Sequence, residues 1–173
     1  MQRFIDAGPT DRLGIYLNDH RGLLAAEYDL ATRCHESNNG PDSDSALATV
    51  LAGIVAQNAD DRSRLDELLD VAGARANPMK TLGARLGERF GRLKLNGQLR
   101  GYSPLSRVVE LEALLASTTI RRSMWSALGN TLVDESSADD ASQRSSAAER
   151  QLHDLVEHHL AATTLAFVGE PSS

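Results

Sequence analysis

The sequence predicts an all-α protein, a bundle of four long helices with one long connection. Aromatic residues make up only 4% of the 173 residues, and Ala and Leu supply most of the apolar side chains, which favours helices over sheets. Apolar residues recur every three or four positions in four long stretches, the spacing of one helix face. Two of the connections are short and the one between the second and third stretches is long, which predicts a four-helix bundle with a single crossover.

The first two helices follow an N-terminal arm of residues 1–10. Thr10 or Asp11 can cap the first helix, because side chains of this kind accept hydrogen bonds from the free amides of a first turn. The segment 37–44 is rich in Asn, Asp, Gly, Pro and Ser, and is predicted to be a turn. The two helices are therefore expected at about 11–34 and 45–72.

The third helix has clear start and stop signals. Ser103 is expected as its N-cap, Pro104 as its first residue and Gly129 as its end. The segment 131–145 is acidic and poor in apolar residues, so we expect a mobile acidic loop there. The last helix is then expected at about 146–167.

The connection between the second and third helices, residues 75–102, is predicted to be a basic crossover. Asn77 and Pro78 are typical of the start of a short helix, which would run to about Phe90. Asn96-Gly97 fits a two-residue hairpin turn. Residues 75–107 contain eight Lys or Arg residues and one acid. With this crossover included, the chain 1–173 is predicted to form one domain.

Composition and charge exclude several classes of function. The formal net charge of −6 gives no general attraction to nucleic acid or to anionic membranes. No apolar run approaches the roughly 20 residues that cross a bilayer. The single cysteine, Cys34, cannot form an intramolecular disulfide, and residues 1–10 lack the apolar segment of a signal peptide. We therefore expect a cytoplasmic protein that binds neither nucleic acid nor membranes.

Several polar residues interrupt the apolar stripes of the helices, and a buried charge is costly unless it is paired. One interpretation is a metal site for Fe, Mn or Zn. The other is an internal salt-bridge network, which Arg122 favours because a guanidinium pairs with carboxylates and repels a cation. The candidate metal ligands are Glu27, Asp61, Glu112, His159 and His20, and the expected buried network comprises His20, Glu27, Asn58, Asp61, Glu112 and Arg122.

Three motifs carry a resemblance to a known superfamily. They are the sequences YLNDH at 16–20, GRLKLNG at 91–97, and SPLSR at 103–107 followed by ELE at 110–112. Over about 12–167 the chain resembles ferritin-like four-helix bundles, and is most similar to an uncharacterised bacterial subgroup. Ferritin-like di-iron enzymes use one Glu from each of two helices and a Glu-x-x-His pair from each of the other two. Glu27 and Glu112 match the lone glutamates, but the chain lacks both pairs and has Asn58-x-x-Asp61 on its second helix.

The missing Glu-x-x-His pairs favour a non-catalytic member of the superfamily without a cofactor. Such a protein is expected to act as a structural or interaction protein, as a homo-oligomer or with a protein partner. Two alternatives stay open. One is a metal-carboxylate protein of the oxidoreductase type, with Fe, Mn or Zn at a non-standard site in the bundle core. The other is a protein that binds an anionic ligand through the basic crossover.

Overall fold

The computed structural model describes residues 9–40, 44–74 and 103–168, and these residues form four helices and no strand. The all-α prediction is therefore confirmed for this part of the chain. The predicted short helix and hairpin of the basic crossover lie outside the described residues. None of the described helices combines the length and apolar character needed to cross a membrane. The helices are α1 (Pro9–Ser37), α2 (Ser45–Val71), α4 (Pro104–Thr131) and α5 (Glu135–Phe167).

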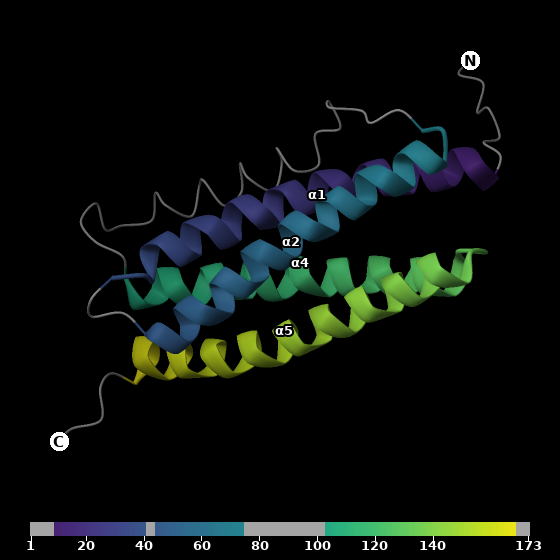
Figure 1. The fold of residues 1–173 in the computed structure, drawn as a ribbon. Helices are drawn as coiled ribbons and strands as arrows, with labels where there is room; N and C mark the ends of the chain where they lie inside the picture. The colour runs from purple at the N-terminus through teal and green to yellow at the C-terminus, as the bar shows by residue number, and fades with distance from the viewer. Residues whose placement is uncertain (1–8, 41–43, 75–102, 169–173) are drawn as a thin grey trace, which may run out of the picture.

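The four helices pack as two antiparallel hairpins, α1 with α2 and α4 with α5 (Figure 1). The hairpins lie against each other so that α1 is beside α4 and α2 is beside α5. Helices α2 and α4 run in the same direction, so the end of α2 and the start of α4 lie at opposite ends of the bundle. Each helix is therefore antiparallel to both of its neighbours, as expected for a four-helix bundle with one long connection.

Three helix starts are fixed by side-chain caps. Asp44 accepts hydrogen bonds from the amides of Ala46 and Leu47 at the start of α2. Ser103 accepts from the amide of Ser106 ahead of Pro104, as the sequence predicts. Satisfying these otherwise free amides is typically worth about 1 kcal/mol per helix.

The third cap corrects the prediction of a mobile loop at 131–145. Asp134 accepts a hydrogen bond from the amide of Ser137, and α5 begins at Glu135. Acidic residues at this position stabilise a helix, because the free amides of the first turn carry partial positive charge. The acidic composition of 134–140 is thus that of a helix start rather than of a loop, and the connection between α4 and α5 is short.

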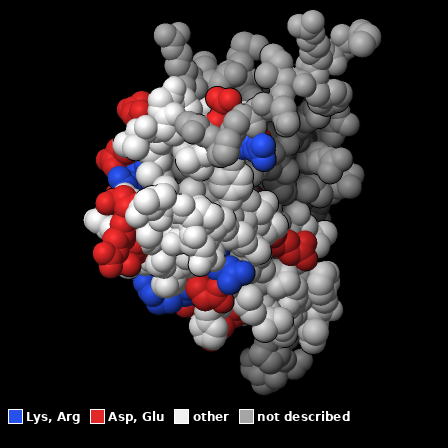
Figure 2. Space-filling view, turned by 90° about the vertical axis from the view of Figure 1, so that its right-hand side faces the viewer, with Lys and Arg blue, Asp and Glu red and all other residues white. Residues whose placement is uncertain are grey.

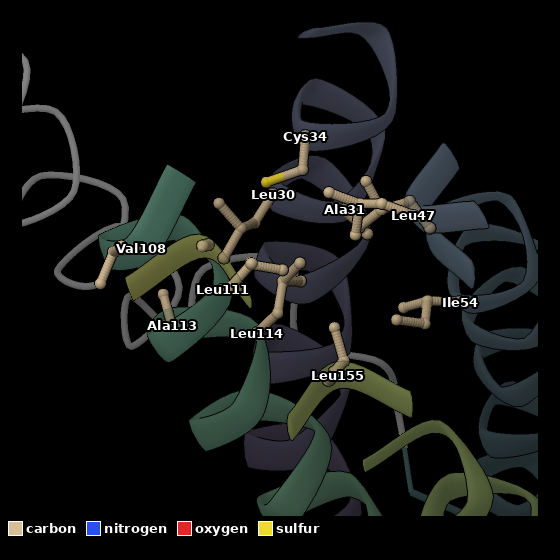
Figure 3. Packing of buried hydrophobic residues seen from close by; sticks show 12 residues of the cluster. Leu30, Ala31, Cys34, Leu47, Ile54, Val108, Leu111, Ala113, Leu114 and Leu155 are labelled. Atoms are coloured by element: carbon tan, nitrogen blue, oxygen red, sulfur yellow. The ribbon is translucent and has the colours of Figure 1, made fainter. Parts of the chain in front are cut away.

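The hydrophobic core consists of two clusters, one towards each end of the bundle. Figure 3 shows the first cluster, where side chains such as Leu30, Ile54, Leu114 and Leu155 converge from all four helices. The second cluster is built around Trp125, again with contributions from all four helices. Its buried members are Leu17, Leu24, Leu65, Leu68, Leu69, Met124, Trp125, Leu128 and Ala141.

Gly129 allows α4 and α5 to approach closely near the start of α5. A Cβ atom at this position would lie 2.7 Å from the hydroxyl oxygen of Ser142 and 3.3 Å from the carbonyl oxygen of Ala138. Gly129 does not end α4, which continues to Thr131. Its role in this structure is to make room for the start of α5.

We predict opposite effects for two Gly-to-Ala substitutions. Gly129→Ala is expected to lower the free energy of unfolding by about 1–3 kcal/mol, because the added methyl group overlaps α5. Gly53→Ala, at an exposed helical site with nothing within 4 Å of the new Cβ, is expected to raise it by about 0.5–1 kcal/mol. Urea unfolding followed by circular dichroism measures both. Equal effects of the two substitutions would contradict the close approach of α5 to Gly129.

Candidate functional site: the polar layer of the bundle core

A layer of buried polar side chains separates the two hydrophobic clusters. Five residues, which we call the polar layer, contribute to it: Glu27 of α1, Asn58 and Asp61 of α2, and Thr118 and Arg121 of α4. None of the five is more than 2% exposed. Charged groups are rarely buried this deeply unless they are paired, so their partners decide what the layer can do.

The guanidinium group of Arg121 lies at the centre of the polar layer. Its Nε donates to both carboxylate oxygens of Glu27 at 3.1 and 3.2 Å, and its Nη1 donates to Oδ2 of Asp61 at 2.9 Å. Its Nη2 donates to the side-chain oxygen of Gln151 on α5 at 2.6 Å. Arg121 therefore connects side chains from all four helices, using the planar set of donors that a guanidinium provides.

A second arginine, Arg144 of α5, closes the layer towards the surface. Its Nη1 lies 2.8 Å from Oδ1 of Asp61 and 2.7 Å from Asp60, and its guanidinium group lies 5.3 Å from the ring centre of Trp125. Oδ1 of Asp61 also accepts a hydrogen bond from the side-chain amide of Gln57 at 3.0 Å. The two buried carboxylates, Glu27 and Asp61, are thus balanced by two arginines.

The carboxylate of Glu27 is almost completely removed from solvent. Burial raises the pKa of Glu27, and this effect outweighs the lowering by Arg121 and by the hydroxyl of Thr118, which donates at 2.8 Å. The nearby Asp61 raises this pKa further. Because the pKa of Glu27 is higher in the folded than in the unfolded chain, the contribution of Glu27 to the free energy of unfolding is largest at low pH. That contribution decreases as the pH rises through the folded-state pKa of Glu27.

Of the predicted network, three residues lie in the polar layer and three do not. Glu27, Asn58 and Asp61 are buried, although neither side-chain amide atom of Asn58 has a hydrogen-bond partner within the described part of the chain. The prediction that Glu112 is buried is wrong, since its side chain is 57% exposed and lies 3.4 Å from His159. His20 is partly buried and packs against the ring of Tyr16.

The prediction of Arg122 as the internal cation is also wrong. Its side chain is 41% exposed and pairs with Glu149 at 2.7 Å, while the neighbouring Arg121 occupies the core. Successive helical residues point about 100° apart, so a shift of one position exchanges an internal for an external side chain. The buried stripe of α4 passes through Leu111, Leu114, Thr118, Arg121, Trp125 and Leu128. That regular spacing is the signal in the sequence that identifies Arg121, rather than Arg122, as the buried arginine.

The residues of the polar layer do not fit a metal ion. Arg121 lies between Glu27 and Asp61 and hydrogen-bonds to both, so a cation could bind them only by displacing a guanidinium group of like charge. Glu112 and His159 form a separate pair near the surface. Within the described ranges, no three His, Cys, Asp or Glu side chains lie together in a way that could hold a metal ion.

The chain was compared with known protein families, with curated proteins and with solved structures, and no match was found in any of the three comparisons. The residue-level geometry of the polar layer is therefore the basis for the functional argument.

We predict that Arg121→Met lowers the free energy of unfolding by about 3–5 kcal/mol, because it leaves Glu27 and Asp61 without their shared partner in the core. The matched control is Arg122→Met, which removes the partly exposed pair with Glu149 and is expected to cost less than about 1 kcal/mol. Urea unfolding provides both values. If Arg121→Met does not fold, Arg121→Lys keeps a positive charge but cannot bridge both carboxylates, and should still destabilise more than Arg122→Met. An equal loss at the two positions would show that the Arg121 pairs contribute little.

Proposed function

We propose that this protein is a non-catalytic, ferritin-like helical bundle that acts by self-association through the outer face of α5. The order of the helices and their antiparallel neighbours support the ferritin-like assignment. The observation that carries the non-catalytic part of the proposal is that the guanidinium group of Arg121 binds both buried carboxylates, those of Glu27 and Asp61. Acids held in this way cannot readily bind a metal ion or exchange protons with a substrate.

The surface of α5 supports the second part of the proposal. Val156, Leu160 and Phe167 are 45%, 60% and 70% exposed, so one helix carries three exposed apolar side chains. Together with Thr163 they are spaced four, three and four residues apart, which is the spacing of a coiled-coil contact stripe. The hydroxyl of Thr163 already donates to the carbonyl oxygen of Leu160, so it requires no further partner.

A second copy of the chain is the partner that fits this stripe best. A stripe with heptad spacing can pack against an identical antiparallel stripe, because a two-fold axis brings the same surface to both sides of the interface. With a net charge of −6, two copies repel each other over long distances. Apolar contact must therefore supply the affinity, and exposed apolar residues on α5 can do so.

The test of self-association is sedimentation equilibrium of the wild-type chain and of Leu160→Glu. We predict a wild-type dimer, and a rise of at least about tenfold in its dissociation constant when a charge enters the apolar stripe. Val133→Glu is the matched control, because Val133 is fully exposed in the connection between α4 and α5, away from the stripe. A wild-type chain that stays monomeric at tens of micromolar, or an equal effect of both variants, would contradict the proposal.

The same preparation tests the metal-carboxylate alternative. Elemental analysis of protein purified without chelator should show no stoichiometric Fe, Mn or Zn. One or two ions per chain that disappear in a variant carrying both Glu27→Gln and Asp61→Asn would contradict the non-catalytic proposal and support the metal-carboxylate alternative. The anionic-ligand alternative rests on the basic crossover, which lies outside the described residues. No contact of the described residues adds support to it.

A further inference from the structure

The first part of α5, residues 135–147, is attached to the bundle in a different way from the rest of the core. We call this segment the strap. Ala141 is its only buried residue, and the other buried residues of α5 follow at Ala148, Leu155 and Ala162. Towards α2 the strap buries little apolar surface, because Ala141 has a small side chain, whereas towards α4 it packs closely at Gly129.

Side chains of the strap contact both α2 and α4. The contact to α4 includes a hydrogen bond from the hydroxyl of Ser145 to the carbonyl oxygen of Arg122 at 3.2 Å, whereas the contacts to α2 are mainly ion pairs. Arg64 of α2 donates to Asp140 at 2.8 Å and to the hydroxyl of Ser137 at 3.0 Å. Arg144 of the strap lies 2.8 Å from Asp61 and 2.7 Å from Asp60. Figure 2 views the end of the bundle where α5 begins, and shows basic and acidic side chains next to one another on this face.

Two of the three ion pairs between the strap and α2 differ from those of Arg121 in their access to solvent. The side chains of Arg64, Asp140 and Asp60 are 23%, 34% and 65% exposed, whereas Asp61, the other partner of Arg144, is completely buried, as are the pairs of Arg121. Dissolved salt weakens exposed pairs strongly and buried pairs only slightly. Salt therefore acts on the outer pairs of the strap, Arg64 with Asp140 and Arg144 with Asp60, and leaves the centre of the polar layer almost unchanged.

The strap covers the single tryptophan of the chain. Trp125 is fully buried, the guanidinium group of Arg144 lies over its ring, and its Nε1 has no hydrogen-bond partner among the described residues. A buried N–H without a partner raises the free energy of the closed state, and contact with water would relieve that cost. Release of the strap would give Trp125 this contact.

We propose that the strap is a salt-sensitive latch that detaches from α2 while α1, α4 and the rest of α5 keep their packing. Detachment breaks the pairs of Arg64 and Arg144 and uncovers Trp125, together with the apolar cluster around it. The buried contacts of Arg121 hold the remainder of the bundle during this local opening. This inference does not depend on the proposed self-association, because none of the residues in the latch belongs to the outer stripe of α5.

Hydrogen exchange measured by mass spectrometry tests the latch in the full chain. Arg64→Gln is the informative variant, since Arg64 contacts Asp140 and Ser137 of the strap and Glu67 of α2, and none of these contacts involves Trp125. We expect exchange at amides 135–147 to become about fivefold faster, the effect of losing one partly exposed ion pair, with little change in α1 and α4. Raising NaCl from low concentration to 1 M, where the screening length is about 3 Å, should produce the same local change in the wild-type chain.

The matched control is Arg21→Gln, which removes a partly exposed pair with Asp66 between α1 and α2. It should leave exchange in the strap unchanged. Acrylamide quenching of Trp125 fluorescence provides a second readout, and quenching should increase in Arg64→Gln but not in Arg21→Gln. Exchange in 135–147 that is unaffected by both salt and Arg64→Gln would overturn the latch. An equal increase in all four helices would also overturn it, because it would indicate opening of the whole bundle.

Discussion

The contacts of one buried guanidinium group, that of Arg121, organise the core of this bundle. Arg121 binds Glu27 of α1, Asp61 of α2 and Gln151 of α5 from its own position on α4. Each contact joins α4 to a different helix, so the polar layer fixes how the four helices are aligned along the bundle axis. An ion pair of this kind adds little net stability compared with well-packed apolar residues, because both charges lose their hydration. It does make misaligned packings costly, since these would leave a buried charge without a partner.

The two hydrophobic clusters and the polar layer have complementary roles. The clusters contain side chains from all four helices and supply most of the favourable free energy of folding. Apolar side chains tolerate exchange with one another, so they specify alignment less strictly than the directional hydrogen bonds of Arg121. Towards the surface the same network continues through Arg144 to Asp60 and Asp140, where exposure weakens each pair. Deep ion pairs therefore set the alignment, and outer ones allow local motion.

Much of the fold could be predicted from the sequence, because apolar spacing and helix caps are local signals. The bounds of α2 and the roles of Ser103 and Pro104 were predictable for this reason. The burial of Glu27 and Asp61 followed from their places in apolar stripes. Arg121 was missed in favour of Arg122, because adjacent arginines differ only in the direction in which they point. The helical start of α5 was missed as well, since its stability depends on Asp134, on the close approach to Gly129 and on ion pairs with a distant helix.

The most direct test of the central role of Arg121 is solvent exchange of its side-chain Nε–H, measured by NMR in the native protein. The signals of Arg121 and of Arg150, an exposed residue of α5, can be assigned by their loss in the two Arg→Lys variants. The account predicts that the Nε–H of Arg121 persists long after transfer to D2O, that the Nε–H of Arg150 exchanges at once, and that added Zn²⁺ leaves the Arg121 signal unchanged. Exchange of Arg121 as rapid as that of Arg150, or a stoichiometric shift of its signal with Zn²⁺, would contradict it.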